Sequence, residues 1–232
     1  MSVPTMKLLL ISNSGRPYLE HCKADILPFL KSSKRPAFVS AALFIDPEEY
    51  FRKVCDALLP APFKLEHLNV DRDPMPVLSR SDALFVGGGN TYRLLKKLRE
   101  TYLLDAIRDR VKKGMPYIGW SAGANVAGPT ILTTNDWNVV SLTDFRALNL
   151  VPFSINPHYL ETDPAMASHS ETRDERIAEY HKANSNTVLG IEEQTSLWIE
   201  GDEIRVVGRN RVRRFEWNRA PVDYRVGDRI VL

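Results

Sequence analysis

The segment 117–125, YIGWSAGAN, places a serine between two glycines, directly after an apolar run and before small residues. This G-x-S-x-G spacing fits a nucleophile elbow, in which the serine occupies a sharp turn between a strand and a helix and the glycines remove side chains that would clash there. Serine is also a common N-cap of helices, where its hydroxyl accepts a backbone hydrogen bond. The motif therefore makes Ser121 a candidate nucleophile and leaves a helix cap as the alternative.

A second loop of the same kind, GGGN at 87–90, follows the apolar run 82–86 and precedes a helical pattern that Asn90 or Thr91 would cap. A serine hydrolase needs backbone N–H groups aimed at the oxyanion of its tetrahedral intermediate. A phosphate-binding loop is the alternative, but the Gly-Lys-Ser/Thr ending and the G-x-G-x-x-G pattern with a later acidic residue are missing. We therefore interpret this loop as one side of an oxyanion hole. The candidate donors are the N–H groups of Ala122 and of Gly88 or Gly89.

A serine nucleophile needs a base, and imidazole, with an ordinary pKa of about 6.5, can take up and return a proton near neutral pH. Of the five histidines, His158 follows the segment 153–157 and stands at the carboxyl end of a predicted strand, which Pro157 is expected to end. His169, in a polar loop, is the second choice. The pattern favours His158 as the base. The other histidines lie in helical or mid-strand patterns typical of surface or core positions: His21, His67 and His181.

The carboxylate that would orient the imidazole is harder to identify, because spacing alone does not separate the acidic candidates. Glu192 and Glu193 end the apolar run 187–191, which is the same strand-end position that the serine and the histidine occupy, and this favours one of the two. The chain order is then Ser, His, Glu, which differs from the Ser, Asp/Glu, His order of the α/β-hydrolases and argues against that fold. The other candidates are Asp136, Asp144, Glu161 and Asp163.

Alternating strand and helix patterns must position these residues. A repeated strand, loop and helix order predicts a three-layer, doubly wound, mainly parallel sheet, with functional loops at the carboxyl ends of the strands. The last third reads instead as antiparallel hairpins, after a helix that begins with a capping box at Thr172 and Glu175. We expect one domain, residues 1–232. The predicted strands are 7–11, 37–44, 63–70, 82–86, 115–119, 187–191, 196–200 and 203–207, and the predicted helices are 18–30, 47–59, 103–113, one from Thr91 and one from Thr172 to about Lys182.

Composition excludes several classes of protein. The 31 basic and 29 acidic side chains give a net charge of +2, and the basic residues are scattered except at 209–214, RNRVRR, which reads as a solvated strand face, so nucleic acid is not an expected partner. No apolar run approaches the length of about 18 residues that a membrane helix needs. Two cysteines indicate no disulfide framework. We expect a cytoplasmic monomer or homodimer without a metal or another cofactor, because no cluster shows metal-ligand spacing.

The chain also resembles the peptidase E, or aspartyl dipeptidase, family of serine peptidases, which includes the cyanophycinases. The likeness covers most of the chain. The segments that carry it are LLLISNS at 8–14, VGGGNT at 86–91, YIGWSAGAN at 117–125, TTND at 133–136, INPH at 155–158 and ETR at 171–173.

The resemblance implies a fold similar to the class I glutamine amidotransferases, with Ser121 as nucleophile, His158 as base and Glu193 as the third member. It also implies cleavage of dipeptides with an N-terminal aspartate. The chain departs from the family at the third member, because family members typically carry a short Pro-Glu-Gly turn before a tryptophan, where this chain has EEQTSLW at 192–198. Glu192 therefore stays an alternative to Glu193, although strand alternation lets only one of them face His158.

Recognition of an N-terminal aspartate requires a cation near the scissile bond, and an arginine can hold a carboxylate with two parallel hydrogen bonds. Arg173 is the candidate, because it would occupy the first turn of a helix, where the helix dipole disfavours a positive charge unless an anion is near. A solvated helix residue is the alternative. Further residues expected to line this pocket are Asn90, Thr91, Thr133 and Asp136. The alternative functions are a hydrolase for aspartyl side-chain links or longer acidic polymers, and a non-catalytic protein that binds a small anion.

Overall fold

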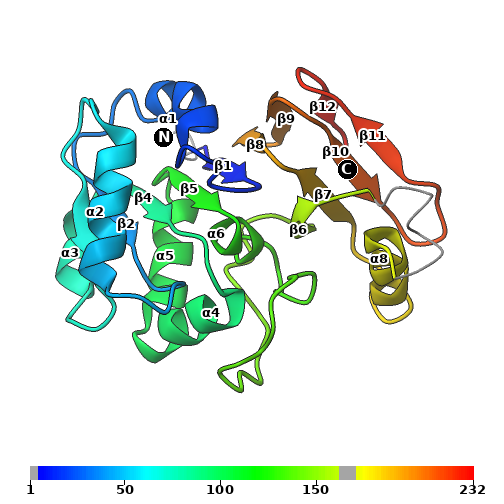
Figure 1. Cartoon of the computed structure of the whole chain (residues 1–232), viewed down its shortest axis with the longest axis horizontal. Coiled ribbons are helices and arrows are strands. Elements are labelled where there is room, and N and C mark those ends of the chain that lie inside the picture. Colours follow the sequence, from blue (N-terminus) through cyan, green and yellow to red (C-terminus); the bar gives the residue numbers. More distant parts are fainter. Residues whose placement is uncertain (1–4, 162–170) are drawn as a thin grey trace.

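The computed structural model describes residues 5–161 and 171–232, and it contains two β-sheets with helices around them (Figure 1). The second-choice base His169 and the carboxylate Asp163 lie outside the described residues. In the described part of the chain, no helix is long and apolar enough to cross a membrane. The larger sheet has eight strands in the order β12-β9-β8-β1-β5-β4-β2-β3, and the smaller sheet has four in the order β11-β10-β7-β6.

Five strands of the larger sheet are parallel, as the alternating pattern predicts. The side chains of four of them, all except the edge strand β3, are buried on both faces, which explains why their sequences are continuous apolar runs instead of alternating ones. Gly119 and Ile118 of the motif strand lie in register with Leu10 and Leu9 of the first strand. These strands are β1 (Lys7–Ile11), β2 (Pro36–Val39), β3 (Glu66–Leu68), β4 (Ala83–Val86) and β5 (Tyr117–Trp120).

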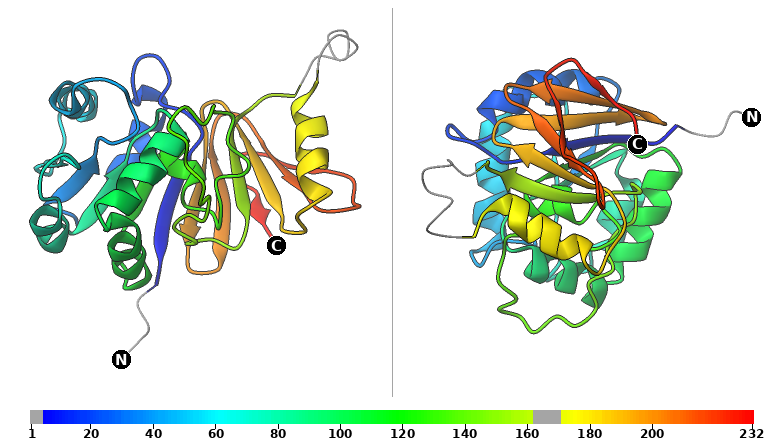
Figure 2. Two further views of the ribbon diagram at one scale, coloured as in Figure 1. Left: turned by 90° about the horizontal axis from the view of Figure 1, so that it is seen from below. Right: turned by 90° about the vertical axis from the view of Figure 1, so that its right-hand side faces the viewer.

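Helices cover both faces of this parallel part (Figure 2). Leu9 and Ile11 pack on one helical layer, whereas Leu8 and Leu10 pack on the other, because successive strand residues point to opposite faces. The first layer contains the 3-10 turn η1 (Glu20–Cys22), α1 (Lys23–Phe29) and α2 (Pro47–Leu58), and the second contains α3 (Met75–Arg80), α4 (Thr91–Glu100) and α5 (Leu103–Lys112). The three-layer, doubly wound arrangement is confirmed, and it agrees with a class I glutamine amidotransferase-like fold.

Three antiparallel strands complete the larger sheet. β8 (Thr195–Glu200) and β9 (Glu203–Gly208) form the predicted hairpin, with Gly201 at φ +59° in its turn, and β12 (Arg229–Ile230) pairs with β9. β8 also pairs with β1, so the hairpin continues the parallel sheet.

The second sheet was not predicted. It contains β6 (Ser154–Tyr159), β7 (Val188–Glu192), β10 (Val212–Phe215) and β11 (Val222–Tyr224). One of its faces shares the main core with the larger sheet, and α8 (Arg173–His181) packs on the other face through Ile177. The expectation that the run 187–191 forms a hairpin with 196–200 is wrong, because β7 pairs with β6 and β10, and the turn at 193–194 crosses from one sheet to the other.

Several element ends also differ from the prediction. The helix expected at 18–30 begins as a 3-10 turn, and the strand expected at 37–44 ends at Val39. Pro157 does not end its strand, because β6 is an edge strand, where a residue without an N–H group is tolerated. The pairing of β6 with β7 shifts its register between Asn156 and Tyr159, so the strand is irregular at His158.

Candidate active site

Ser121 occupies the turn between β5 and the single-turn helix α6 (Ala122–Asn125). Its backbone has φ +53° and ψ −113°, a conformation that residues other than glycine rarely adopt and that costs free energy. The hydroxyl forms no hydrogen bond to the first turn of α6, so Ser121 precedes the helix without capping it. The geometry is that of a nucleophile elbow, and it disfavours the alternative of a helix cap.

Two glycines make room for this turn. A Cβ atom on Gly123 would lie 2.0 Å from the carbonyl oxygen of Val86, and a Cβ on Gly88 would lie 2.9 Å from the Cβ of Ser121. Real Cβ atoms essentially never approach backbone oxygen so closely, so α6 can sit against β4 only with glycine at 123. The position of the Ser121 turn is therefore set by the absence of side chains.

His158 connects Ser121 to Glu193. Its Nε2 lies 2.8 Å from Ser121 Oγ, and its Nδ1 lies 2.6 Å from Glu193 Oε1. Because an ionised carboxylate only accepts hydrogen bonds, Nδ1 is the donor to Glu193, and Nε2 of the neutral ring is then free to accept the hydroxyl proton of Ser121. The structure thus brings together the nucleophile, base and acid that the sequence predicts. The side chains of His158 and Glu193 are 41% and 48% exposed, so a substrate can reach them.

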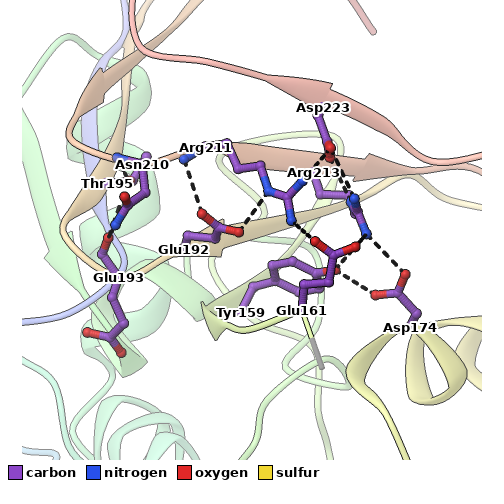
Figure 3. A network of polar contacts seen from close by, with 10 residues as sticks. All are labelled: Tyr159, Glu161, Asp174, Glu192, Glu193, Thr195, Asn210, Arg211, Arg213 and Asp223. Carbon is purple, nitrogen blue, oxygen red and sulfur yellow. Dashed lines mark hydrogen bonds and ion pairs between the residues drawn. The ribbon is translucent and has the colours of Figure 1, made fainter. Parts of the chain in front are cut away.

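The carboxylates of the two neighbouring glutamates point in different directions (Figure 3). Glu192 Oε1 accepts a hydrogen bond from Arg211 Nε at 2.8 Å, whereas Glu193 turns away from Arg211 and contacts His158. Asp144 is paired with Arg146. Among the carboxylates considered as partner of the imidazole and described by the structure, Glu193 is therefore the one that contacts His158.

Sequence reasoning missed the role of Ser12 and Asn13, which follow β1. The buried Ser12 Oγ accepts a hydrogen bond from the His158 N–H group and donates one to the Ile191 carbonyl, both at 2.8 Å. Asn13 Oδ1 accepts from the Gln194 N–H group at 2.8 Å. These contacts tie the backbones at His158, Ile191 and Gln194 to the end of β1. A polar pair directly after a buried strand was the available signal.

Two of the residues expected to form the oxyanion hole lie beside Ser121, because Ala122 follows it in the chain and a Cβ on Gly88 would lie 2.9 Å from its Cβ. Within the described ranges, the N–H groups of Gly88, Gly89 and Ala122 have no hydrogen-bond acceptor. The Tyr50 hydroxyl donates to the Gly88 carbonyl at 2.9 Å and fixes the orientation of that peptide. These groups are thus available to an oxyanion, and their role there stays a prediction.

Asn90 and Thr91, at the start of α4, contact the loop that contains Asp136. Asp136 Oδ2 accepts hydrogen bonds from the Thr91 N–H group at 2.7 Å and from its hydroxyl at 2.6 Å. Asn90 caps α4 by accepting from the Arg93 N–H group, and its Nδ2 donates to the Trp137 carbonyl at 2.9 Å. These contacts hold the loop around Asp136 against the start of α4. A direct role of the three residues in substrate binding stays a prediction.

Arg173 and Thr133 line one small cavity of about 60 Å³, together with Asn156, which is two residues before His158. The capping box at Thr172 and Glu175 is confirmed, and it places Arg173 in the first turn of α8. Burial lowers the pKa of the Arg173 guanidinium, and the nearby charge of Arg176 lowers it further. Among the described residues, Arg173 has no ion-pair partner. The site therefore offers a partly desolvated cation to an anionic ligand.

The arrangement is suited to acyl transfer through a serine. It combines a hydroxyl bonded to an imidazole, a carboxylate that fixes the ring, and N–H groups beside the nucleophile. No group of three or more His, Cys, Asp or Glu side chains within residues 5–161 and 171–232 is arranged to hold a metal ion.

Comparisons of the sequence and the fold with known proteins agree with one another. The sequence profile described as Peptidase family S51 matches residues 8–207. The chain is 43% identical to "Peptidase E" of Streptomyces coelicolor, over 96% of this chain and 92% of that protein, and 43% identical to the "Probable alpha-aspartyl dipeptidase" of Drosophila melanogaster, over 90% and 89%. A crystal structure of a peptidase from an acI-B1 Actinobacterium superposes with a TM-score of 0.77 at 15% identity, over 100% of this chain and 99% of that one, which shows likeness of fold alone.

Proposed function

Because this chain belongs to Peptidase family S51, we propose that it is a serine dipeptidase that hydrolyses dipeptides with an N-terminal aspartate. The observation that carries the proposal is the hydrogen-bonded series from Ser121 through His158 to Glu193. The names of the two relatives, peptidase E and alpha-aspartyl dipeptidase, support the substrate class.

In the proposed mechanism, His158 Nε2 takes the proton of Ser121 as Oγ attacks the carbonyl carbon of the aspartyl residue. Glu193 stabilises the imidazolium that forms and keeps the ring in the required tautomer. The N–H groups of Ala122 and of Gly88 or Gly89 stabilise the oxyanion. The imidazolium then returns its proton to the leaving amine, and the peptide bond breaks. Water, deprotonated by the same ring, attacks the acyl-enzyme, and the imidazolium returns this proton to Ser121 Oγ as aspartate is released.

Specificity for aspartate follows from Arg173. A guanidinium that is partly buried without an acidic partner among the described residues gains most when a substrate carboxylate enters beside it. The cavity also contains polar groups from Thr133 and Asn156. Asn90, Thr91 and Asp136 would shape the wall of the pocket through their mutual contacts.

Hydrolysis of Asp-Leu by the wild-type protein beside Ser121→Ala and Arg173→Ala tests the proposal. We expect Ser121→Ala to keep the fold and to lose about 10⁴- to 10⁶-fold in kcat, as expected when a serine nucleophile is removed. Arg173→Ala should lose activity on Asp-Leu and not on Ala-Leu. Full activity of Ser121→Ala would overturn the mechanism. Full activity of Arg173→Ala on Asp-Leu would overturn only the specificity argument.

A substrate panel separates the proposed activity from its alternatives. Asp-Leu should be cleaved in preference to Glu-Leu, Ala-Leu and isoaspartyl-Leu, whereas preference for isoaspartyl-Leu would indicate action on aspartyl side-chain links. An absence of hydrolysis together with binding of free aspartate would indicate a binding protein.

We also propose that residues 1–232 form a single peptidase domain that works in the cytoplasm as a monomer or homodimer. The shared core between the two sheets supports one domain, and the free cysteines Cys22 and Cys55 fit a reducing compartment. Light scattering of the purified protein separates the two oligomeric states.

A further inference from the structure

The arginine-rich segment 209–214 does not form a solvated strand face. Arg211 lies just before β10 and Arg213 within it, on the face that α8 covers, and their side chains are only 25% and 13% exposed. Phe215, on the same face, packs with Tyr159 in the cluster beneath α8. Two guanidinium groups are thus largely covered beside the proposed active site, without contacting the reacting residues.

Arg213 binds three segments that are distant in the sequence (Figure 3). Its Nε and Nη2 donate to the two carboxylate oxygens of Asp223, at 2.6 and 3.0 Å, which fixes the plane of the guanidinium. Its Nη1 donates to Glu161 at 2.9 Å, and to Asp174 and the Tyr159 hydroxyl at 3.3 Å each. The Tyr159 hydroxyl in turn donates to Asp174 at 2.6 Å. Arg213 therefore links β11, the end of β6 and the first turn of α8.

Arg211 forms the second half of this network. Its Nε donates to Glu192 at 2.8 Å and its Nη1 to Asp223 at 2.5 Å, and its Nη2 donates to Glu161. The two guanidinium groups face four carboxylates, so removal of one guanidinium would leave like charges close together without compensation.

His158 and Arg173 each have a sequence neighbour in this network. Tyr159 follows His158, and Asp174 follows Arg173. The Tyr159 ring packs with Phe215 beneath α8, whereas the His158 ring contacts Ser121 and Glu193, so the network can hold the backbone beside the base without touching the reacting groups. The bond between Tyr159 and Asp174 is thus a short connection between the catalytic base and the proposed aspartate-binding cation, and Arg213 holds both of its members.

We propose that Arg213 is a positioning residue for aspartate selectivity. Through Asp174 and Tyr159 it fixes the first turn of α8 against the end of β6, and so fixes the distance from the Arg173 guanidinium to the reacting His158. This inference rests on the proposed function and deepens it, because it assigns part of the specificity to a residue that does not touch the substrate.

The test compares Arg213→Met with Arg214→Met, using Asp-Leu and Ala-Leu as substrates. Arg214 is the neighbouring residue on the opposite face of β10, where it donates to the Val231 carbonyl, so its substitution removes the same charge without touching the network. For Arg213→Met we expect the ratio of kcat/KM between Asp-Leu and Ala-Leu to fall about ten- to hundredfold, mainly through a higher KM for Asp-Leu, since displacements of about 1 Å have effects of this size. Arg214→Met should keep the wild-type ratio.

Two further variants make the result decisive. Asp174→Asn, at a half-exposed position, should lower the same ratio in the same direction and serves if Arg213→Met does not fold. In an Arg173→Ala background, Arg213→Met should leave the ratio unchanged, because the group it positions is gone.

An unchanged ratio in Arg213→Met or in folded Asp174→Asn would overturn the inference, as would an equal loss on both substrates, which indicates a merely structural role. If wild-type protein does not cleave Asp-Leu, the proposed function itself fails, and the inference with it.

Discussion

The two sheets position their active-site residues through different kinds of interaction. In the parallel sheet, Ser121 is positioned by steric fit, because Gly88 and Gly123 allow backbone to approach where any side chain would collide. In contrast, His158 of the smaller sheet and Glu193, which directly follows β7 of that sheet, are positioned by hydrogen bonds and by the ion pairs beneath them. The comparison teaches that the nucleophile should respond to changes of volume, and the base and acid to changes of polarity and charge.

Among the changes that test this comparison, removal of the negative charge of Glu193 should reduce activity the most. We expect Glu193→Gln to lower kcat about 10³-fold or more, because the amide no longer stabilises the imidazolium and permits the wrong tautomer. Glu192→Gln should stay within about tenfold of wild type, since its amide can still accept from Arg211. Steady-state hydrolysis of Asp-Leu measures both, and equal losses would contradict the separate roles of the two glutamates.

A single added methyl group should disrupt the steric half of the site. We expect Gly123→Ala to lower kcat about a hundredfold and to lower the free energy of unfolding by about 1–3 kcal/mol, because its Cβ would push α6 away from β4. Gly128→Ala is the milder comparison and should lose less in both quantities, since its Cβ would lie 3.1 Å from the Phe153 carbonyl oxygen. Urea unfolding and kinetics check both quantities. Wild-type behaviour of Gly123→Ala would show that the elbow tolerates side chains.

Removal of the Ser12 hydroxyl should weaken the contact between the end of β1 in the larger sheet and the strands β6 and β7 of the smaller sheet. We expect Ser12→Ala to reduce kcat about tenfold, because a buried N–H group and a buried carbonyl each lose a partner, at a cost of about 1–3 kcal/mol. Ser196→Ala removes a buried hydroxyl that has no partner among the described residues, and it should leave activity unchanged. If both variants lose activity to the same extent, the loss results from removing any buried hydroxyl and not from the hydrogen bonds of Ser12.

The smallest expected effect is on the stability of the fold at acid pH. Hydrogen bonding to Arg213 lowers the pKa of Asp223 in the folded protein, so this pair stabilises the fold above the ordinary carboxyl pKa of about 4 and loses that contribution as the pH falls through the lowered value. The difference in urea midpoint between wild type and Arg213→Met should therefore shrink as the pH is lowered from about 6 towards 2. A difference that grows on acidification would contradict the ion pair.

Much of the parallel half was predictable, because its strands are buried on both faces and its helices have clear caps at Asp46, Asn90 and Gly114. Ser121 could be found for the same reason, because it directly follows β5, whereas His158 was selected although β6 continues past it to Tyr159. The smaller sheet was not predictable, because its strands pair across long separations and their local patterns do not state which sheet they join. The role of Arg211 and Arg213 was hidden as well, since a charged residue that alternates with apolar ones looks the same whether solvent or carboxylates surround it.

The place of β1 in the larger sheet has a consequence for synthesis of the chain. β1 lies between β5 and β8, and Leu8 is in register with both Tyr117 and Ile199. During synthesis, β1 must therefore wait until β8 has been made before its second edge is paired. Glu193 is made after Ser121 and His158, so a nascent chain cannot complete this group of three before that residue emerges, and the long-range pairing of β1 favours slow folding.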